Sequence, residues 1–186
     1  MMLMIRGIII LHLVSVCIAA NTTKKISFET GNKLAVLRFE GDGVSDPLIE
    51  HLTEELRQSI RDLKIFNVQN QDITNDVHIF YPRSKDYWSC WNKECAVDIG
   101  RQLRVNYVIA GNIQKKENNE FFINGRLFSV DMEMMMNEFA MNSSGITDSL
   151  LLEMKKMAFN VSGLPIPDTL LADLDTTGIN VTENIK

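Results

Sequence analysis

Residues 105–113 carry apolar side chains at both odd and even positions, and this pattern constrains the fold more than any other segment. The segment reads Val-Asn-Tyr-Val-Ile-Ala-Gly-Asn-Ile. A strand that is apolar on both faces is buried on both, which is typical of a central strand with helices on each side. The sequence therefore predicts a sheet packed between helices.

An amphipathic helix is expected upstream of this strand. Residues 33–39 form a short apolar strand closed by a turn at Gly41-Asp42-Gly43, and Ser45 and Pro47 are residue types that begin helices. One helical face carries Leu48, Ile49, Leu52, Leu56, Ile60 and Leu63, and the other faces carry Glu50, Glu54, Glu55, Arg57 and Arg61. We expect the apolar face to lie on the sheet and the polar faces to stay in water.

The second half of the chain predicts two more helices and two more strands. Asn92 is expected to cap a helix, and a polar turn after residue 113 makes a hairpin of the central strand and residues 121–130. A strand around 135–141 follows, and Thr147 is expected to cap the last helix.

This order of elements predicts an α/β (α+β) fold, in which one domain over residues 33–163 holds a mixed β-sheet with helices packed on both faces. Residues 65–68 supply one more short strand. Residues 21–32 are expected to be a short linker, and residues 164–186 an acidic, flexible tail with little periodicity.

Residues 1–20 have the pattern of a secretion signal. Arg6 is their single charge, and the apolar run that follows ends in Ala19-Ala20. A membrane-spanning helix needs about 20 uninterrupted apolar residues, which is more than this run offers. The pattern therefore predicts export.

Cys17 is a candidate lipidation site. It ends Val14-Ser15-Val16-Cys17, which is similar to a bacterial lipobox, although Val16 stands where Gly, Ala or Ser is usual. Ordinary cleavage near Ala19 or Ala20 is the alternative. Attachment to a membrane is expected only if Cys17 is acylated.

The charge of the chain excludes one class of partner. The 186 residues carry a formal net charge of −5. Binding of nucleic acid requires clustered Lys and Arg to neutralise phosphates, so no nucleic acid is expected as a partner.

Three segments together resemble a known family. They are Lys33-Leu-Ala-Val-Leu-Arg-Phe39, Gly41-Asp-Gly-Val-Ser45, and Cys95-Ala-Val-Asp-Ile-Gly100 leading into the central strand. The chain resembles the periplasmic domain family shared by CsgG-type curli assembly proteins, the amino-terminal domain of TolB and the penicillin-binding-protein activator LpoB. The resemblance implies a small α/β module that binds proteins in the bacterial envelope without catalysis. The paired amphipathic hairpins from which CsgG builds a pore are not found, so pore formation is not implied.

Cys90 and Cys95 are expected to form a structural disulfide, because nearby thiols pair in an oxidising periplasm. A zinc site would need four ligands, and only His51 and His78 remain as histidines after export. A redox pair would normally have two intervening residues, whereas this pair has four.

A methionine cluster raises the alternative of copper binding, since thioethers suit Cu(I). Its members are Met132, Met134, Met135, Met136 and Met141. Methionine is more often an adaptable core filler, and on a strand Met134 and Met136 lie opposite Met135, so the sulfurs would not converge. We expect no metal and no cofactor.

Tyr87, Trp88 and Trp91 crowd the least regular segment and are candidate partner-binding residues. Alternatively, these side chains cover the core beneath a long loop. The turn at Gly41-Asp42-Gly43 lacks the third glycine of a phosphate-binding fingerprint. No nucleophile elbow, His-Glu-x-x-His or P-loop sequence is present, so no catalytic residues are assigned.

The sequence therefore predicts an exported, non-enzymatic bacterial envelope protein, periplasmic or associated with the outer membrane, that binds envelope proteins of unknown identity. The alternative is a lipid-anchored, self-associating subunit of an outer-membrane secretion or assembly complex, in which the chain forms a homo-oligomer. A third hypothesis is a secreted hydrolase, and it is motivated only by the segment that carries Tyr87, Trp88 and Trp91.

Overall fold

The computed structural model describes residues 31–70 and 90–171. Its elements are β1 (Lys33–Val36), β2 (Glu40–Asp42), α1 (Asp46–Asp62), β3 (Asn67–Val68), α3 (Lys93–Leu103), β4 (Tyr107–Lys115), β5 (Glu120–Ser129), β6 (Met134–Ser144) and α4 (Thr147–Val161).

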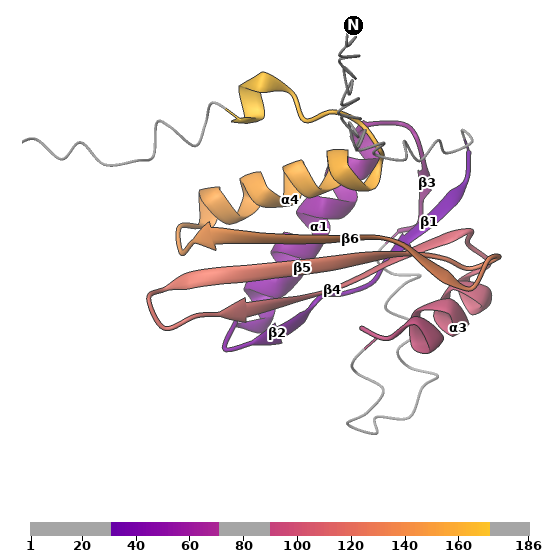
Figure 1. Ribbon diagram of the computed structural model, residues 1–186, viewed down its shortest axis with the longest axis horizontal. Helices are drawn as coiled ribbons and strands as arrows, with labels where there is room; N and C mark the ends of the chain where they lie inside the picture. The colour runs from indigo at the N-terminus through magenta and orange to yellow at the C-terminus, as the bar shows by residue number, and fades with distance from the viewer. Residues whose placement is uncertain (1–30, 71–89, 172–186) are drawn as a thin grey trace, which may run out of the picture.

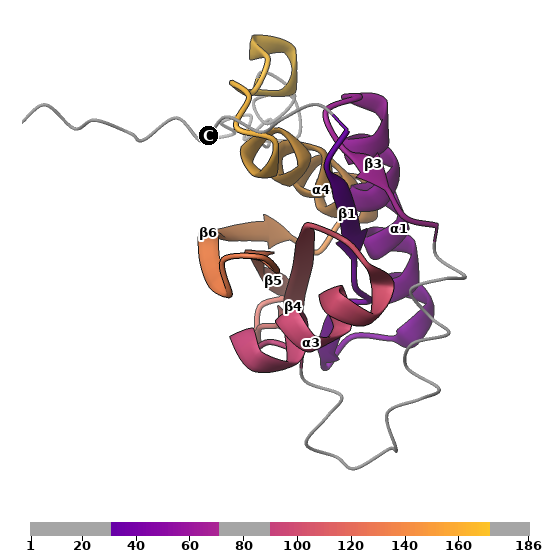
Figure 2. The ribbon, with the colours of Figure 1, turned by 90° about the vertical axis from the view of Figure 1, so that its right-hand side faces the viewer.

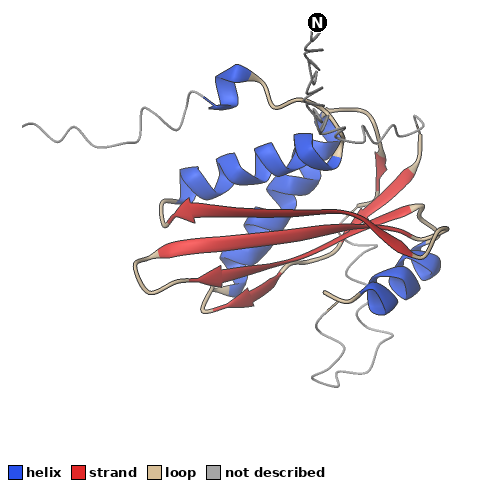
Figure 3. Cartoon of the chain, in the orientation of Figure 1, coloured by secondary structure: helices blue, strands red, loops and turns tan. Residues whose placement is uncertain are grey.

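The strands form one six-stranded mixed sheet in the order β3-β1-β4-β5-β6, and β2 also pairs with β4 (Figure 3). The pairs β1–β3, β1–β4 and β2–β4 are parallel, and β4, β5 and β6 follow one another as antiparallel neighbours. The predicted hairpin is the β4–β5 pair. The central strand β4 contacts β1, β2 and β5, as its two apolar faces indicated.

Helices lie on both faces of the sheet, which confirms the predicted fold class. α1 and α4 lie together on one face, here called the closed face, and α3 lies at one end of the opposite face, here called the open face (Figures 1 and 2). The closed face holds the larger core, built from β1, β4, β5, β6, α1 and α4. The open face holds a smaller core beneath α3.

β1 and β2 are two parts of one interrupted strand line along β4. β1 pairs with Tyr107–Ile109 and β2 with Asn112–Gln114. Gly41 and Asp42 therefore belong to a strand, and the predicted turn at Gly41-Asp42-Gly43 is wrong for the first two residues. The reason is tertiary, because β4 extends far enough to pair with a second segment. The Phe39 ring fills the interruption beside Gly111, where a Cβ would lie 2.5 Å from the ring.

Two side chains of α1 satisfy the main chain at this interruption. Thr53 Oγ1 accepts a hydrogen bond from Phe39 N at 3.2 Å, and Arg57 Nη2 donates to Val36 O at 2.9 Å. Arg57 is 1% exposed and also pairs with Glu54. The prediction that Arg57 lies in water is therefore wrong, because an interrupted strand leaves a carbonyl that needs a buried donor.

The helices begin close to the predicted residues, but only one of the three expected cap residues forms a side-chain hydrogen bond. Asn92 Oδ1 accepts a hydrogen bond from Cys95 N at 2.8 Å, as expected of a cap. Ser45 precedes α1 but makes no side-chain cap bond. The cap of α4 is Ile146, also without a side-chain bond, so the prediction that Thr147 caps this helix is wrong.

Candidate functional site

The open face carries a group of side chains beyond the end that α3 covers. Strand alternation places them on this face: Asn112 and Gln114 on β4, Phe122, Asn124 and Arg126 on β5, and Glu138 on β6. All are half-buried or exposed, whereas the neighbouring Val108, Ala110 and Phe128 are buried. We call these six residues the open-face group. An antiparallel sheet can leave one face in water, but this half-face also carries an arginine and an aromatic ring, residue types enriched in protein interfaces, so it is a candidate binding surface.

Arg126 joins three parts of the molecule at the centre of this surface. Its Nε donates to Glu138 Oε1 at 2.9 Å across the β5–β6 pair. Its Nη1 donates to Trp91 O at 3.2 Å, and its Cζ lies 3.7 Å from the centroid of the Trp91 ring. The guanidinium plane is thus held between a carboxylate and an indole, a geometry that arginine supports better than lysine.

A disulfide holds Trp91 in this position. The structure joins Cys90 to Cys95, and the bond links the residue before Trp91 to the first turn of α3. Cys90 is buried in the core beneath α3, so the residue before Trp91 is fixed in position. The disulfide and the Asn92 cap together order the segment that presents the indole to Arg126.

Two asparagines on paired positions of β4 and β5 contain unsatisfied oxygens. Asn112 lies opposite Asn124, and the Oδ1 atom of each is buried without a hydrogen-bond partner among the described residues. Asn124 Nδ2 also lies 3.4 Å from Glu138 Oε1. A buried polar atom without a partner costs free energy, so these two oxygens are acceptors that an incoming donor would satisfy.

The far end of the open-face group adds an aromatic contact. The Phe122 ring is half-buried, and Lys116 Nζ lies 5.4 Å from its centroid. The surface therefore offers two aromatic rings, each with a cation beside it, on either side of the asparagine pair.

The electrostatics of this surface keep Glu138 ionised. The hydrogen bond that Arg126 donates to its carboxylate lowers the pKa of Glu138 below the ordinary value. The charged pair is half-exposed, with 26% of the Arg126 side chain and 40% of the Glu138 side chain accessible. The pair orients Arg126 while leaving part of both groups in contact with solvent.

The structure contains one of the three aromatic residues predicted to bind a partner. Trp91 lies on Arg126, as described above. Tyr87 and Trp88 lie outside the described residues, as does the candidate lipidation site Cys17. Their roles stay predictions.

The methionine cluster divides between surface and core. Met132, Met134 and Met135 are exposed, whereas Met136 and Met141 pack against the closed-face core. Met136 is the extra residue of a β-bulge opposite Leu127 and Phe128, between Met135 and Asn137. Within residues 31–70 and 90–171, no group of three His, Cys, Asp or Glu side chains could hold a metal ion.

Sequence reasoning missed Arg126 as the centre of the surface. Strand alternation in β5 places Phe122, Arg126 and Phe128 on one face. That spacing was the available signal. The contact with Trp91, which is 35 residues away in sequence, depends on the path of the chain and has no local signature.

None of the helices in the described part of the chain combines the length and the apolar character that crossing a bilayer requires.

Comparisons with known proteins find similarity at the level of structure alone. No family model and no curated protein matches the sequence. Lipoprotein GNA1162 from Neisseria meningitidis superposes with a TM-score of 0.51 at 6% identity, over 78% of this chain and 92% of that one. LpoB from Escherichia coli superposes with a TM-score of 0.50 at 14% identity, over 62% of this chain and 58% of that one.

A third solved structure, the LpoB C-terminal domain from Salmonella enterica, has a TM-score of 0.49 at 15% identity, over 62% of this chain and 84% of that one. The expected likeness to LpoB is found as a likeness of fold, in the superposition on the Escherichia coli protein. Membership of a family that also contains CsgG and TolB stays a prediction.

Proposed function

We propose that this chain is an exported, non-enzymatic protein of the bacterial envelope whose α/β module binds another envelope protein through the open-face group. The observation that carries the proposal is Arg126, held by Trp91 and Glu138 on a half-face of the sheet that α3 leaves uncovered. The fold of the chain is similar to those of a lipoprotein and of LpoB, and this similarity supports the envelope as the place where the chain acts.

The chemistry of the surface suits a protein partner. Interface cores are enriched in aromatic residues and arginine, and the open-face group combines both with asparagine donors and acceptors. Arg126 is already oriented by the indole and the carboxylate, so binding would cost little side-chain entropy. The unsatisfied oxygens of Asn112 and Asn124 give a partner's N–H groups a place to donate.

Site-specific photo-crosslinking tests this proposal in cells that export the chain. A benzophenone side chain keeps the Phe122 ring and extends it by a benzoyl group, and the matched control carries the same group at His51, which is exposed on α1. We expect an adduct with another protein from position 122 and none from position 51. The Arg126→Glu substitution is expected to abolish the adduct, because it reverses the charge at the centre of the surface.

Two results would contradict the proposal. One is an equal adduct yield from positions 122 and 51, and the other is a position-122 adduct that survives Arg126→Glu. Circular dichroism of the purified Arg126→Glu chain verifies that it is folded, so a lost adduct reports on binding.

A further inference from the structure

The outer edge of β6 is unpaired in the described sheet. β6 pairs with β5 and with no other described strand, and it is 11 residues long, whereas β3 at the opposite edge has two. Long edge strands present rows of N–H and C=O groups that can pair with another strand.

The hydrogen-bond pattern identifies which residues of β6 face outward. Lys116 N donates to Glu120 O and Val130 N donates to Asn106 O, so the even-numbered residues of β5 bond toward β4. Its odd-numbered residues therefore bond toward β6, where they lie opposite residues 137, 139, 141 and 143. The main-chain groups of Glu138, Ala140 and Asn142 consequently point away from the sheet.

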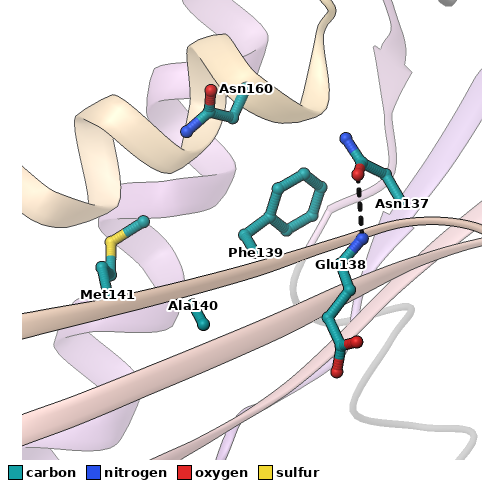
Figure 4. Close-up of a pocket in the computed structure, with 6 residues that line it drawn as sticks. All are labelled: Asn137, Glu138, Phe139, Ala140, Met141 and Asn160. Carbon is teal, nitrogen blue, oxygen red and sulfur yellow. Dashed lines mark hydrogen bonds between the residues drawn. The ribbon is translucent and has the colours of Figure 1, made fainter. Parts of the chain in front are cut away.

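One contact at the edge agrees with this assignment. Glu138 N donates to Asn137 Oδ1 at 3.0 Å, a bond within the strand rather than to β5 (Figure 4). In the single chain the adjacent side chain satisfies this donor, and an added strand would replace Asn137 Oδ1 with a main-chain carbonyl.

The edge lacks the residues with which natural proteins prevent strand pairing. Residues 137–144 contain no proline and no lysine, and Glu138 is their single charge. The β-bulge lies before this stretch, opposite Leu127 and Phe128, and leaves it regular. A hollow of about 290 Å³ beside the edge is lined by Asn137, Phe139, Met141 and, from α4, Asn160, together with Glu138 and Ala140 (Figure 4).

The side-chain sequence is self-complementary about Ala140. An antiparallel pairing of two copies centred there would place Phe139 opposite Met141, Glu138 opposite Asn142, and Asn137 opposite Ser143. Apolar side chains then meet apolar ones, and the carboxylate meets an amide. Outward-facing residues also lie opposite one another, as hydrogen-bonded antiparallel pairs require.

Neighbouring registers are less favourable. A two-fold axis at Glu138 would oppose two carboxylates, and an axis at Asn142 would oppose Met141 to Ser143. The register centred on Ala140 avoids both mismatches.

We propose that the β6 edge pairs with the β6 edge of a second copy of this chain, antiparallel and centred on Ala140, to form a two-fold symmetric dimer with a continuous sheet. The hollow between β6 and α4 lies beside this seam, where Phe139 and Met141 of the two copies would be neighbours. This interface uses the main chain of β6, which borders the open-face group at Glu138, and it needs neither Arg126 nor Trp91.

Charge placed at the axis tests the proposal on the purified full chain. Ala140 is exposed, so Ala140→Lys and Ala140→Asp are tolerated by the single chain, but each puts like charges directly opposite each other in the dimer. We expect sedimentation equilibrium to give a dimer Kd that rises at least about tenfold for each variant. An equimolar mixture of the two variants is expected to restore dimerisation, because the opposed charges then attract.

A matched control separates a local effect from a change of net charge. Asn118→Lys adds a lysine at an exposed position in the β4–β5 turn, and it is expected to leave the dimer Kd unchanged. The proposal is overturned if the unmodified chain is a monomer at every concentration, or if its dimer tolerates Ala140→Lys. It is also overturned if the mixed variants fail to associate. An adduct from position 122 with a protein other than a second copy tests the proposed function separately from these three outcomes.

Discussion

Arg57 lies on the closed face of the sheet and Arg126 on the open face, and the two guanidinium groups differ in what surrounds them. Arg57 is 1% exposed and donates to the main-chain carbonyl of Val36. Arg126 retains 26% exposure of its side chain and is held by a carboxylate, a carbonyl and an indole. Burial lowers the pKa of Arg57 from its ordinary value. Arg126 lies at a partly exposed surface.

The difference separates a structural arginine from a recognition arginine. Arg57 satisfies a strand that is interrupted between β1 and β2, so its removal damages the fold. Arg126 satisfies no interruption in the sheet, and its partners orient a charge toward the surface. We therefore expect substitutions on the closed face to reduce stability, and substitutions in the open-face group to reduce binding.

The largest loss of stability is expected from Arg57→Ala. The change leaves Val36 O without its donor and opens a cavity where the largest fully buried side chain stood, which together cost about 3 kcal/mol or more. Urea unfolding followed by circular dichroism measures the loss. Arg57→Met keeps most of the packing and is expected to lose about half as much. If Arg57→Ala costs less than about 1 kcal/mol, the loss expected for Arg126→Ala, then Arg57 is not the structural arginine of the pair.

Replacement of both Cys90 and Cys95 by serine is expected to cost about 2 kcal/mol, because a short crosslinked loop restricts the unfolded chain. Hydrogen exchange locates the effect. We expect faster exchange in α3, while α1 and α4 on the closed face stay protected. Equal stability of the unmodified chain with and without reductant would show that the bond contributes nothing.

The sequence predicted the parts of this comparison that depend on local patterns. The two-sided apolar character of β4 placed helices on both faces, and Asn92 was correctly identified as the cap of α3. Contacts between distant segments were missed. The pairing of Gly41 and Asp42 with β4, the burial of Arg57 and the contact of Trp91 with Arg126 each depend on chain segments that the local pattern does not contain.

The two arginines should also differ in how much stability they provide. Arg126→Ala is expected to cost about 1 kcal/mol, because a half-exposed ion pair and one cation–π contact are each weak in water. The same variant is expected to abolish the Phe122 crosslink. Arg126→Lys serves as the control, since it keeps the charge but not the planar contact with Trp91. Intact crosslinking by Arg126→Ala would show that the open-face arginine has no part in recognition.

The smallest expected effect is a pH dependence of stability that arises from Glu138 on the open face. The hydrogen bond from Arg126 lowers the pKa of Glu138 below its ordinary value of 4.5, so the folded state holds this carboxylate ionised at a pH where the unfolded chain begins to bind a proton. The resulting stabilisation is fully present above that ordinary value and is lost as the pH falls through the lower folded pKa. Glu138→Gln removes the titrating group. The free energy of unfolding of this variant should therefore decline less steeply than that of the unmodified chain below about pH 4.5, and the two pH curves should run parallel above that pH. Urea midpoints measured from pH 7 to pH 3 compare the two curves, and added salt should bring them together because the pair is exposed to screening. If the acid limbs of the two curves coincide at low salt, Arg126 does not hold Glu138 in solution, and the orientation of the guanidinium would then depend on Trp91 alone.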